Sequence, residues 1–249
     1  MKTFGKIKQW SVAVFLAIIV GFASGLFMFV PVSRGLFTVA EPLIFVLALL
    51  SGPYVGAFVG GVGSALASYL LGYPHYVIAS LAVKASAGFM IGWLIRLKQP
   101  TENKLLSIVM SLILILFFGL AGVKIYSGDV YFGYVKTFFL GENVLSPGGL
   151  QAYGMFVPEW FWVISSATIA AYIILCELKS ATKLNWASIA LLSGCSVMIF
   201  GYFLYETFLM PTFFGVTVDP VANITTNAGQ SILSATIALI LGRTFMLKR

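Results

Sequence analysis

Charged residues are scarce in this sequence of 249 residues. They make up 9% of the chain, whereas 60% of the residues are hydrophobic, and the mean hydropathy is +1.00. Because soluble domains carry about a quarter charged residues, this scarcity excludes a water-soluble fold. The apolar residues form runs of about 20, which is the length a helix needs to cross a hydrocarbon core roughly 30 Å thick. These runs do not alternate with polar residues, which excludes a membrane β-barrel.

Histidine and cysteine are also rare. His75 is the single histidine, and the two cysteines, Cys176 and Cys195, lie in separate apolar segments without a second ligand nearby. A metal site needs a cluster of such ligands, and an enzyme needs a nucleophile with a base, or a metal, at suitable spacing. We therefore expect no metal site, no cofactor and no catalytic residues, and we expect that the protein is not an enzyme.

The net charge of +7 indicates membrane topology rather than a nucleic-acid partner, because the basic residues form short clusters beside apolar runs and not one basic face. Positively charged loops stay in the cytoplasm. With the N-terminus inside, most Lys and Arg residues fall on the cytoplasmic side: Lys2, Lys6, Lys8, Arg96, Lys98, Lys104, Lys179, Lys183, Arg243, Lys248 and Arg249. Only Arg34, Lys124 and Lys136 fall outside. We expect a multi-pass protein of the cell membrane with both termini in the cytoplasm.

The apolar runs predict an all-α membrane protein of about eight transmembrane helices. The expected spans are about 10–30, 37–50, 53–71, 76–96, 104–125, 158–178, 186–208 and 223–244. Short turns join most of them, such as Ser51-Gly52-Pro53, because proline cannot continue a preceding helix and glycine permits the reversal.

Residues 126–157 differ from these turns, because they form a long segment rich in Tyr, Phe and Gly. We expect this segment to lie outside the cell. It could form a lid or an interfacial segment, or an aromatic-rich loop that rests on the membrane surface, with Trp160 and Trp162 in the aromatic belt.

Ionisable side chains are costly inside a bilayer, so they usually face a partner or a cavity. Lys84 lies eight residues into the expected span 76–96, roughly 12 Å below its outer end at 1.5 Å per residue. Glu41 and Glu206 lie near the outer ends of their helices, and Tyr202 lies one turn below Glu206 on the same face.

The last expected helix carries a polar stripe, because Asn223, Asn227, Gln230 and Ser234 recur at spacings of 4, 3 and 4. Two interpretations remain open. Lys84 could pair with Glu206 or Glu41 to neutralise a buried charge, while the amide stripe holds helices together. Alternatively, these groups line a small-molecule pocket in the outer half of the bilayer, where Lys84 could hold an anionic group. Their common depth favours the pocket, so the predicted substrate-binding residues are Glu41, Lys84, Tyr202, Glu206, Asn223, Asn227 and Gln230.

Small residues recur at every fourth position of the first expected helix, at Ala13, Ala17, Gly21 and Gly25. Such a ladder lets another helix approach closely. It therefore implies a partner helix, either inside or outside the chain.

Several motifs resemble the substrate-binding S components of energy-coupling factor (ECF) transporters. They are GPYVGAFVGG at 52–61, LGYP at 71–74, Val83-Lys84 followed by Gly88 to Gly92, GYFLYE at 201–206 and NAGQ at 227–230. The resemblance covers residues 10–98 and 186–249. It rests on the order of the motifs along the chain. The pair Ala13-x-x-x-Ala17 resembles the alanine motif on the first helix of these proteins, which docks on the transmembrane coupling subunit. The resemblance therefore implies partner docking at Ala13, Ala17 and Gly21.

The resemblance also implies an architecture, a six-helix core with an inserted helical hairpin. Residues 1–98 would form the first four transmembrane helices of the core, residues 99–183 an inserted helix pair with a long outer loop, and residues 184–249 the last two core helices.

A function follows from the same resemblance. The protein would capture a vitamin-like small molecule or another micronutrient and pass it to a transmembrane coupling subunit and two ATPase subunits. The sequence agrees in having no Walker A pattern of its own. The alternatives are an accessory or structural subunit of another membrane complex, and a self-sufficient carrier.

Overall fold

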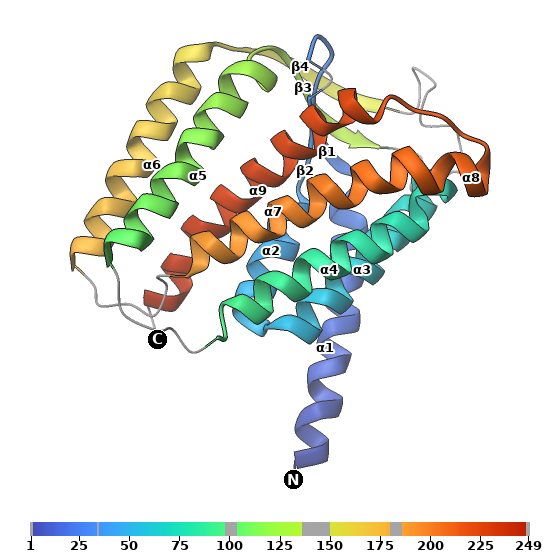
Figure 1. The fold of residues 1–249 in the computed structure, drawn as a ribbon, viewed down its shortest axis with the longest axis horizontal. Helices are drawn as coiled ribbons and strands as arrows, with labels where there is room; N and C mark the ends of the chain where they lie inside the picture. Colours follow the sequence, from blue (N-terminus) through green and yellow to red (C-terminus); the bar gives the residue numbers. More distant parts are fainter. Residues whose placement is uncertain (1, 34, 98–103, 136–149, 180–185, 248–249) are drawn as a thin grey trace.

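The computed structural model describes residues 2–33, 35–97, 104–135, 150–179 and 186–247, and its helices form a tilted bundle with a small sheet at one end (Figure 1). The helices are α1 Lys2–Ala23, α2 Ala40–Ser51, α3 Pro53–Leu70, the 3-10 turn η1 Pro74–Tyr76, α4 Val77–Leu94, α5 Lys104–Ile125, α6 Glu159–Lys179, α7 Ala187–Leu204, the π-helix η3 Tyr205–Leu209, α8 Met210–Phe214 and α9 Pro220–Leu247. The strands are β1 Leu26–Val30, β2 Gly35–Thr38, β3 Gly128–Val135 and β4 Leu150–Val157.

The described residues include five helices that are long and apolar enough to cross a membrane, and two shorter apolar helices at Trp10–Ala23 and Ala40–Ser51. The long spans are Pro74–Leu94, Leu105–Ile125, Glu159–Cys176, Ala187–Phe214 and Pro220–Thr244. This confirms the helical membrane protein expected from the hydropathy. The sequence predictions for Arg34, Lys98, Lys136, Lys183, Lys248 and Arg249 fall outside the described residues.

A four-stranded antiparallel sheet of order β2-β1-β3-β4 covers one end of the bundle, and it was not expected. The first expected helix was placed at 10–30, but α1 ends at Ala23 and residues 26–30 form β1. The second was placed at 37–50, but β2 occupies 35–38 and α2 begins at Ala40. The segment 126–157 was expected to be a lid, an interfacial segment or an aromatic-rich loop. Its described ends form strands, and residues 136–149 lie outside the described part.

Strand formation at these positions has a physical cause in the residue types. The segments LFMFV and GLFT are rich in aromatic and β-branched residues, which favour a pleated surface. Backbone groups near a membrane need hydrogen-bond partners, and β1 finds them on both sides, since Phe27 pairs with Thr38 of β2 and Gly133 of β3.

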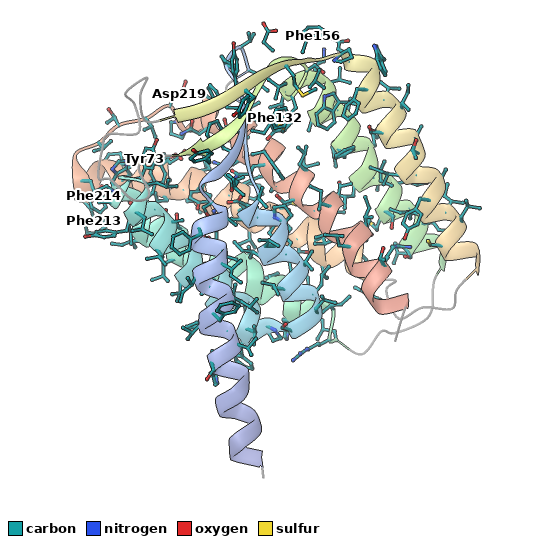
Figure 2. The ribbon with its side chains drawn as sticks, turned by 180° about the vertical axis from the view of Figure 1, so that it is seen from behind. Tyr73, Phe132, Phe156, Phe213, Phe214 and Asp219 are labelled. Atoms are coloured by element: carbon teal, nitrogen blue, oxygen red, sulfur yellow. The ribbon has the colours of Figure 1, made fainter. Side chains whose placement is uncertain are left out.

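Aromatic side chains gather at the end of the bundle that carries the sheet. Figure 2 shows Phe132 and Phe156 on the sheet, with Phe213 and Phe214 of α8 and Tyr73 toward the same end. Aromatic residues are enriched at the surface of a bilayer. The two ends of the chain lie toward the opposite end of the molecule (Figure 1).

The helices α3 and α4 are in close backbone contact, because glycines face each other across their interface. A Cβ atom on Gly88 would lie 2.4 Å from the carbonyl oxygen of Gly56. A Cβ atom on Gly60 would lie 2.7 Å from the carbonyl oxygen of Lys84. Neither distance leaves room for a side chain, so α3 and α4 form one tightly packed layer.

The small-residue ladder of α1 packs against α3 of the same chain. Ala13 and Ala17 are buried, and the space beside Gly21 is filled by Leu66. A Cβ atom on Gly63 of α3 would lie 2.7 Å from the carbonyl oxygen of Ala17. The structure therefore gives this ladder a partner helix inside the chain, and the docking of a coupling subunit at Ala13, Ala17 and Gly21 remains a prediction.

We predict that Gly88→Ala lowers the free energy of unfolding by about 1–3 kcal/mol, because the added methyl group overpacks the interface between α3 and α4. The measurement is unfolding of the purified protein in detergent. Ser86→Ala on the exposed side of α4 is the control, and its effect should stay within about 0.5 kcal/mol. Equal stability of the two variants would contradict the close contact.

Candidate functional site

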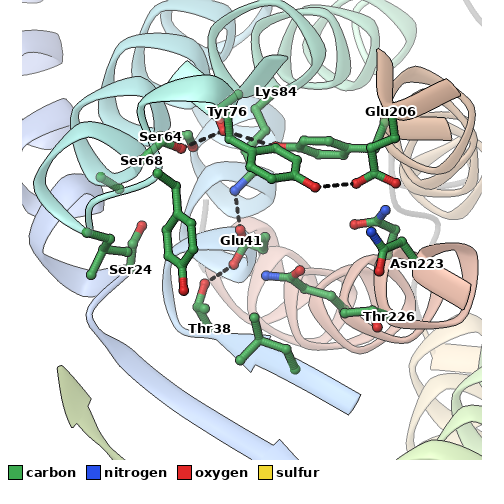
Figure 3. A pocket seen from close by; sticks show the side chains of 18 residues that line it. Ser24, Thr38, Glu41, Ser64, Ser68, Tyr76, Lys84, Glu206, Asn223 and Thr226 are labelled. Atoms are coloured by element: carbon green, nitrogen blue, oxygen red, sulfur yellow. Dashed lines mark hydrogen bonds and ion pairs between the residues drawn. The ribbon is translucent and has the colours of Figure 1, made fainter. Parts of the chain in front are cut away.

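A cavity of about 270 Å³ lies between α2, α3, α4, α7 and α9, and β2 contributes to its wall (Figure 3). Most of its lining residues carry a polar side-chain group. The lining residues are Ser24, Leu36, Thr38, Glu41, Ser64, Ala67, Ser68, Leu71, Tyr73, Tyr76, Ser80, Lys84, Tyr202, Glu206, Asn223, Thr226, Asn227 and Gln230.

The structure brings together all the residues that the sequence predicted for the substrate site. Glu41 comes from α2, Lys84 from α4, Tyr202 from α7 and Glu206 from η3, and α9 contributes Asn223, Asn227 and Gln230. These residues are far apart in the sequence, so their convergence is a property of the fold. Their role in substrate binding remains a prediction.

Lys84 pairs with Glu41. The sequence had left two partners open, Glu41 and Glu206. The Lys84 ammonium donates a hydrogen bond to Oε1 of Glu41, and the Thr38 hydroxyl donates one to Oε2 of the same carboxylate. The Lys84 side chain is 13% exposed and the Glu41 side chain 1%. The charge of Lys84 is therefore already balanced, and the expectation that it could hold an anionic group loses its basis.

Glu206 faces the opposite side of the cavity, on the π-helix η3. A π-helical turn contains one residue more than an α-helical turn, and such turns occur frequently at functional sites. The Tyr76 hydroxyl donates a hydrogen bond of 2.9 Å to Oε1 of Glu206, and the Asn223 side chain lies beside the same carboxylate (Figure 3). Glu206 is 3% exposed, and no described residue makes a hydrogen bond to its Oε2 atom.

A chain of hydroxyl groups connects two walls of the cavity. Ser68 of α3 lies 2.7 Å from Ser80 of α4, and Ser80 lies 3.2 Å from the hydroxyl of Tyr202 on α7. The Ser64 hydroxyl, one turn from Ser68, is buried and has no hydrogen-bond partner among the described residues. Burial raises the pKa of Tyr73, which lies outside the membrane spans, so its hydroxyl stays neutral.

Several lining residues were missed by the sequence argument. Ser64 and Ser68 were not predicted, although their spacing of four fits a polar stripe on one helix face. Thr38 could not be found, because it belongs to a strand that was expected to be helical. His75 does not line the cavity, and its backbone carbonyl accepts a hydrogen bond from the Tyr205 hydroxyl.

The described residues contain no group of three or more His, Cys, Asp and Glu side chains that could hold a metal ion. The chemistry that the cavity offers is thus hydrogen bonding from hydroxyl, amide and carboxylate groups, with one internal ion pair.

Comparison with known proteins gives a match to the family described as ECF-type riboflavin transporter, S component, over residues 6–144, more than half of the chain. The chain belongs to this family. S components are membrane proteins without enzymatic activity that bind a small-molecule substrate for an ECF transporter and work with its energising module. The match runs through α5 and β3, so the family pattern extends into residues 99–183, and the insertion of that segment remains a prediction.

A relative among curated proteins is described as "Uncharacterized protein in gap 3'region" of Pyrococcus woesei. It is 42% identical over 64 residues, which cover 26% of this chain and 43% of the relative. The match thus spans less than half of the length of that relative. No solved structure matches the chain significantly.

We predict that Lys84→Met destabilises the protein by about 3–5 kcal/mol, because it leaves the buried Glu41 carboxylate without its cation. The double variant Lys84→Met/Glu41→Gln removes both charges, and it should recover most of this loss. Unfolding of the purified protein in detergent measures the stability of the single and of the double variant. A single variant as stable as the double variant would show that the ion pair does not stabilise the fold.

Proposed function

We propose that this S component captures a vitamin-like small molecule in the cavity between α2, α3, α4, α7 and α9. The observation that carries the proposal is the convergence of polar residues from separate helices on one cavity in a protein that is otherwise apolar. Polar groups inside a bilayer are costly unless they serve a site or a partner. Riboflavin is the first compound to test, because the description of the family names it.

The size and the lining of the cavity support a compact ligand that carries both apolar and hydrogen-bonding groups. Its volume of about 270 Å³ is close to the lower end, about 300 Å³, of the range for small-molecule sites. Asn223, Asn227 and Gln230 lie on one side of α9, and their amide groups can both donate and accept hydrogen bonds. Such groups suit the polar edges of a heteroaromatic ring or of a hydroxylated chain.

Energy for uptake would come from other subunits. We propose a transmembrane coupling subunit and two ATPase subunits as partners, as the resemblance to S components implies. We expect docking on α1, as predicted for Ala13, Ala17 and Gly21, and because this ladder is buried against α3 the contact would extend over the neighbouring face of the helix. The outward face of α1, which exposes Trp10, Phe15 and Phe22, is apolar and available for such a contact.

The proposed topology places the sheet and the cavity mouth outside the cell and both termini in the cytoplasm. Arg96 follows α4, and the C-terminal ends of α4 and α9 lie at the end of the bundle opposite the sheet (Figure 1). This placement agrees with the positive-inside rule.

We predict that Gln230→Leu weakens ligand binding about tenfold, the equivalent of one hydrogen bond of roughly 1.4 kcal/mol. The ligand that co-purifies with the protein is identified by mass spectrometry, and its affinity is then measured by calorimetry. Thr236→Val is the control, because Thr236 is buried on the same helix but does not line the cavity. Unchanged affinity of Gln230→Leu would remove Gln230 from the site, and the absence of any bound or binding small molecule would refute the proposed function.

We predict that Asp129→Cys, at the start of β3, reacts with an impermeant thiol reagent in intact cells, in a background without Cys176 and Cys195. Thr244→Cys, near the end of α9, should react only after the cells are opened. Both side chains are exposed. The reverse labelling pattern would overturn the proposed orientation.

A further inference from the structure

We infer that the cavity selects its ligand by charge: it accepts an uncharged or cationic compound that donates a hydrogen bond to Glu206, and it excludes the phosphorylated form of the same compound. The inference rests on the proposed function, because it concerns the ligand of the same cavity. It goes further in assigning the discrimination to Glu41, Lys84 and Glu206.

The cavity has few charged groups, and one of them has no opposite charge beside it. Glu41 and Glu206 are the carboxylic acids and Lys84 the amine among the lining residues. Lys84 is paired with Glu41, and Thr38 donates to the remaining oxygen of Glu41. The pair is therefore neutral as a whole, and it offers no uncompensated positive charge to a ligand.

Glu206 supplies the charge that remains. The described part of the chain places no cation within salt-bridge distance of it, and its Oε1 atom receives a hydrogen bond from Tyr76. An ionised Glu206 repels an anion, and a protonated Glu206 leaves the cavity without net charge. In neither state does the cavity compensate a phosphate group that has lost its water.

Two buried polar atoms of the cavity lack a hydrogen-bond partner among the described residues, namely Oε2 of Glu206 and the hydroxyl oxygen of Ser64. Buried polar groups are almost always hydrogen-bonded. An ionised carboxylate oxygen can only accept, and the side chain of Asn223 also interacts with this carboxylate, so the open position at Oε2 suits one further donor. A ligand with an N–H or O–H group directed at η3 supplies this partner, and Ser64 on α3 can bind a second polar group of the same ligand.

The pairing of Lys84 gives the discrimination a second test. Glu41→Gln keeps the size of the side chain but leaves Lys84 with an unbalanced positive charge beside the cavity. This variant should therefore tolerate an anionic ligand better than the natural protein does.

The experiment compares riboflavin with its 5′-phosphate, flavin mononucleotide, which have the same ring system and differ in one phosphate group. Each is titrated into the purified full-length protein in detergent, and binding is followed by quenching of flavin fluorescence. We expect riboflavin to bind and flavin mononucleotide to bind at least 100-fold more weakly. Glu206→Gln should weaken riboflavin binding at least tenfold, and Glu41→Gln should reduce the ratio between the two flavins at least tenfold.

Asp219→Asn is the matched control. Asp219 lies outside the cavity, and its carboxylate accepts hydrogen bonds of 3.1 Å from the backbone N–H groups of Val221 and Ala222 at the start of α9. The amide oxygen of asparagine can keep these bonds, so both flavin affinities should stay unchanged. Thermal unfolding of every variant without ligand separates a loss of binding from a loss of structure.

Binding of flavin mononucleotide within threefold of riboflavin would overturn the inference and leave the proposed function standing. So would a folded Glu206→Gln variant with unchanged riboflavin affinity. If the natural protein binds neither flavin, the result counts against riboflavin as the ligand and against this inference together.

Discussion

The buried pair of Lys84 and Glu41 is the constraint on which much of this structure depends. A lysine at this depth needs an opposite charge within reach, and Glu41 meets it only because α2 begins at Ala40, level with the middle of α4. The chain must therefore turn back after α1 before α2 starts. The hairpin of β1 and β2 provides this reversal, and Thr38 at its end adds the second hydrogen bond to Glu41.

A rigid wall supports the same pair. The backbones of α3 and α4 touch at Gly56, Gly60 and Gly88, so the position of Lys84 along its helix is fixed relative to α3. The other wall is less regular, because α7 passes into the π-helix η3 before α8. One side of the cavity is thus set by close packing, whereas the side that carries Glu206 is set by a local departure from α-helical geometry.

The sequence predicted the helical spans well where each helix satisfies its own backbone. Residues 104–125 were expected as a helix and are α5, because a long apolar run with helical hydrogen bonding needs no information from elsewhere in the chain. The polar stripe of α9 and the depth of Lys84 predicted which side chains meet, since helical spacing fixes both. The strands could not be predicted in this way, because LFMFV at 26–30 becomes a strand through pairing with residues 131–134. Thr38 was missed for the same reason, and the partner of Ala13 and Ala17 could not be assigned because a small-residue ladder does not identify the helix that packs on it.

The pairing of β1 with β3 also imposes an order on biogenesis. Leu26 lies opposite Tyr134, so β1 is synthesised long before the strand that completes its hydrogen bonds. At a synthesis rate of 5–20 residues per second, the wait is about 5–20 s. During this time the first hairpin has an open edge, and α1 to α4 are already emerging at the membrane. The hairpin that contributes the β2 wall of the cavity therefore becomes part of a complete sheet only late in translation, after α5 has been synthesised.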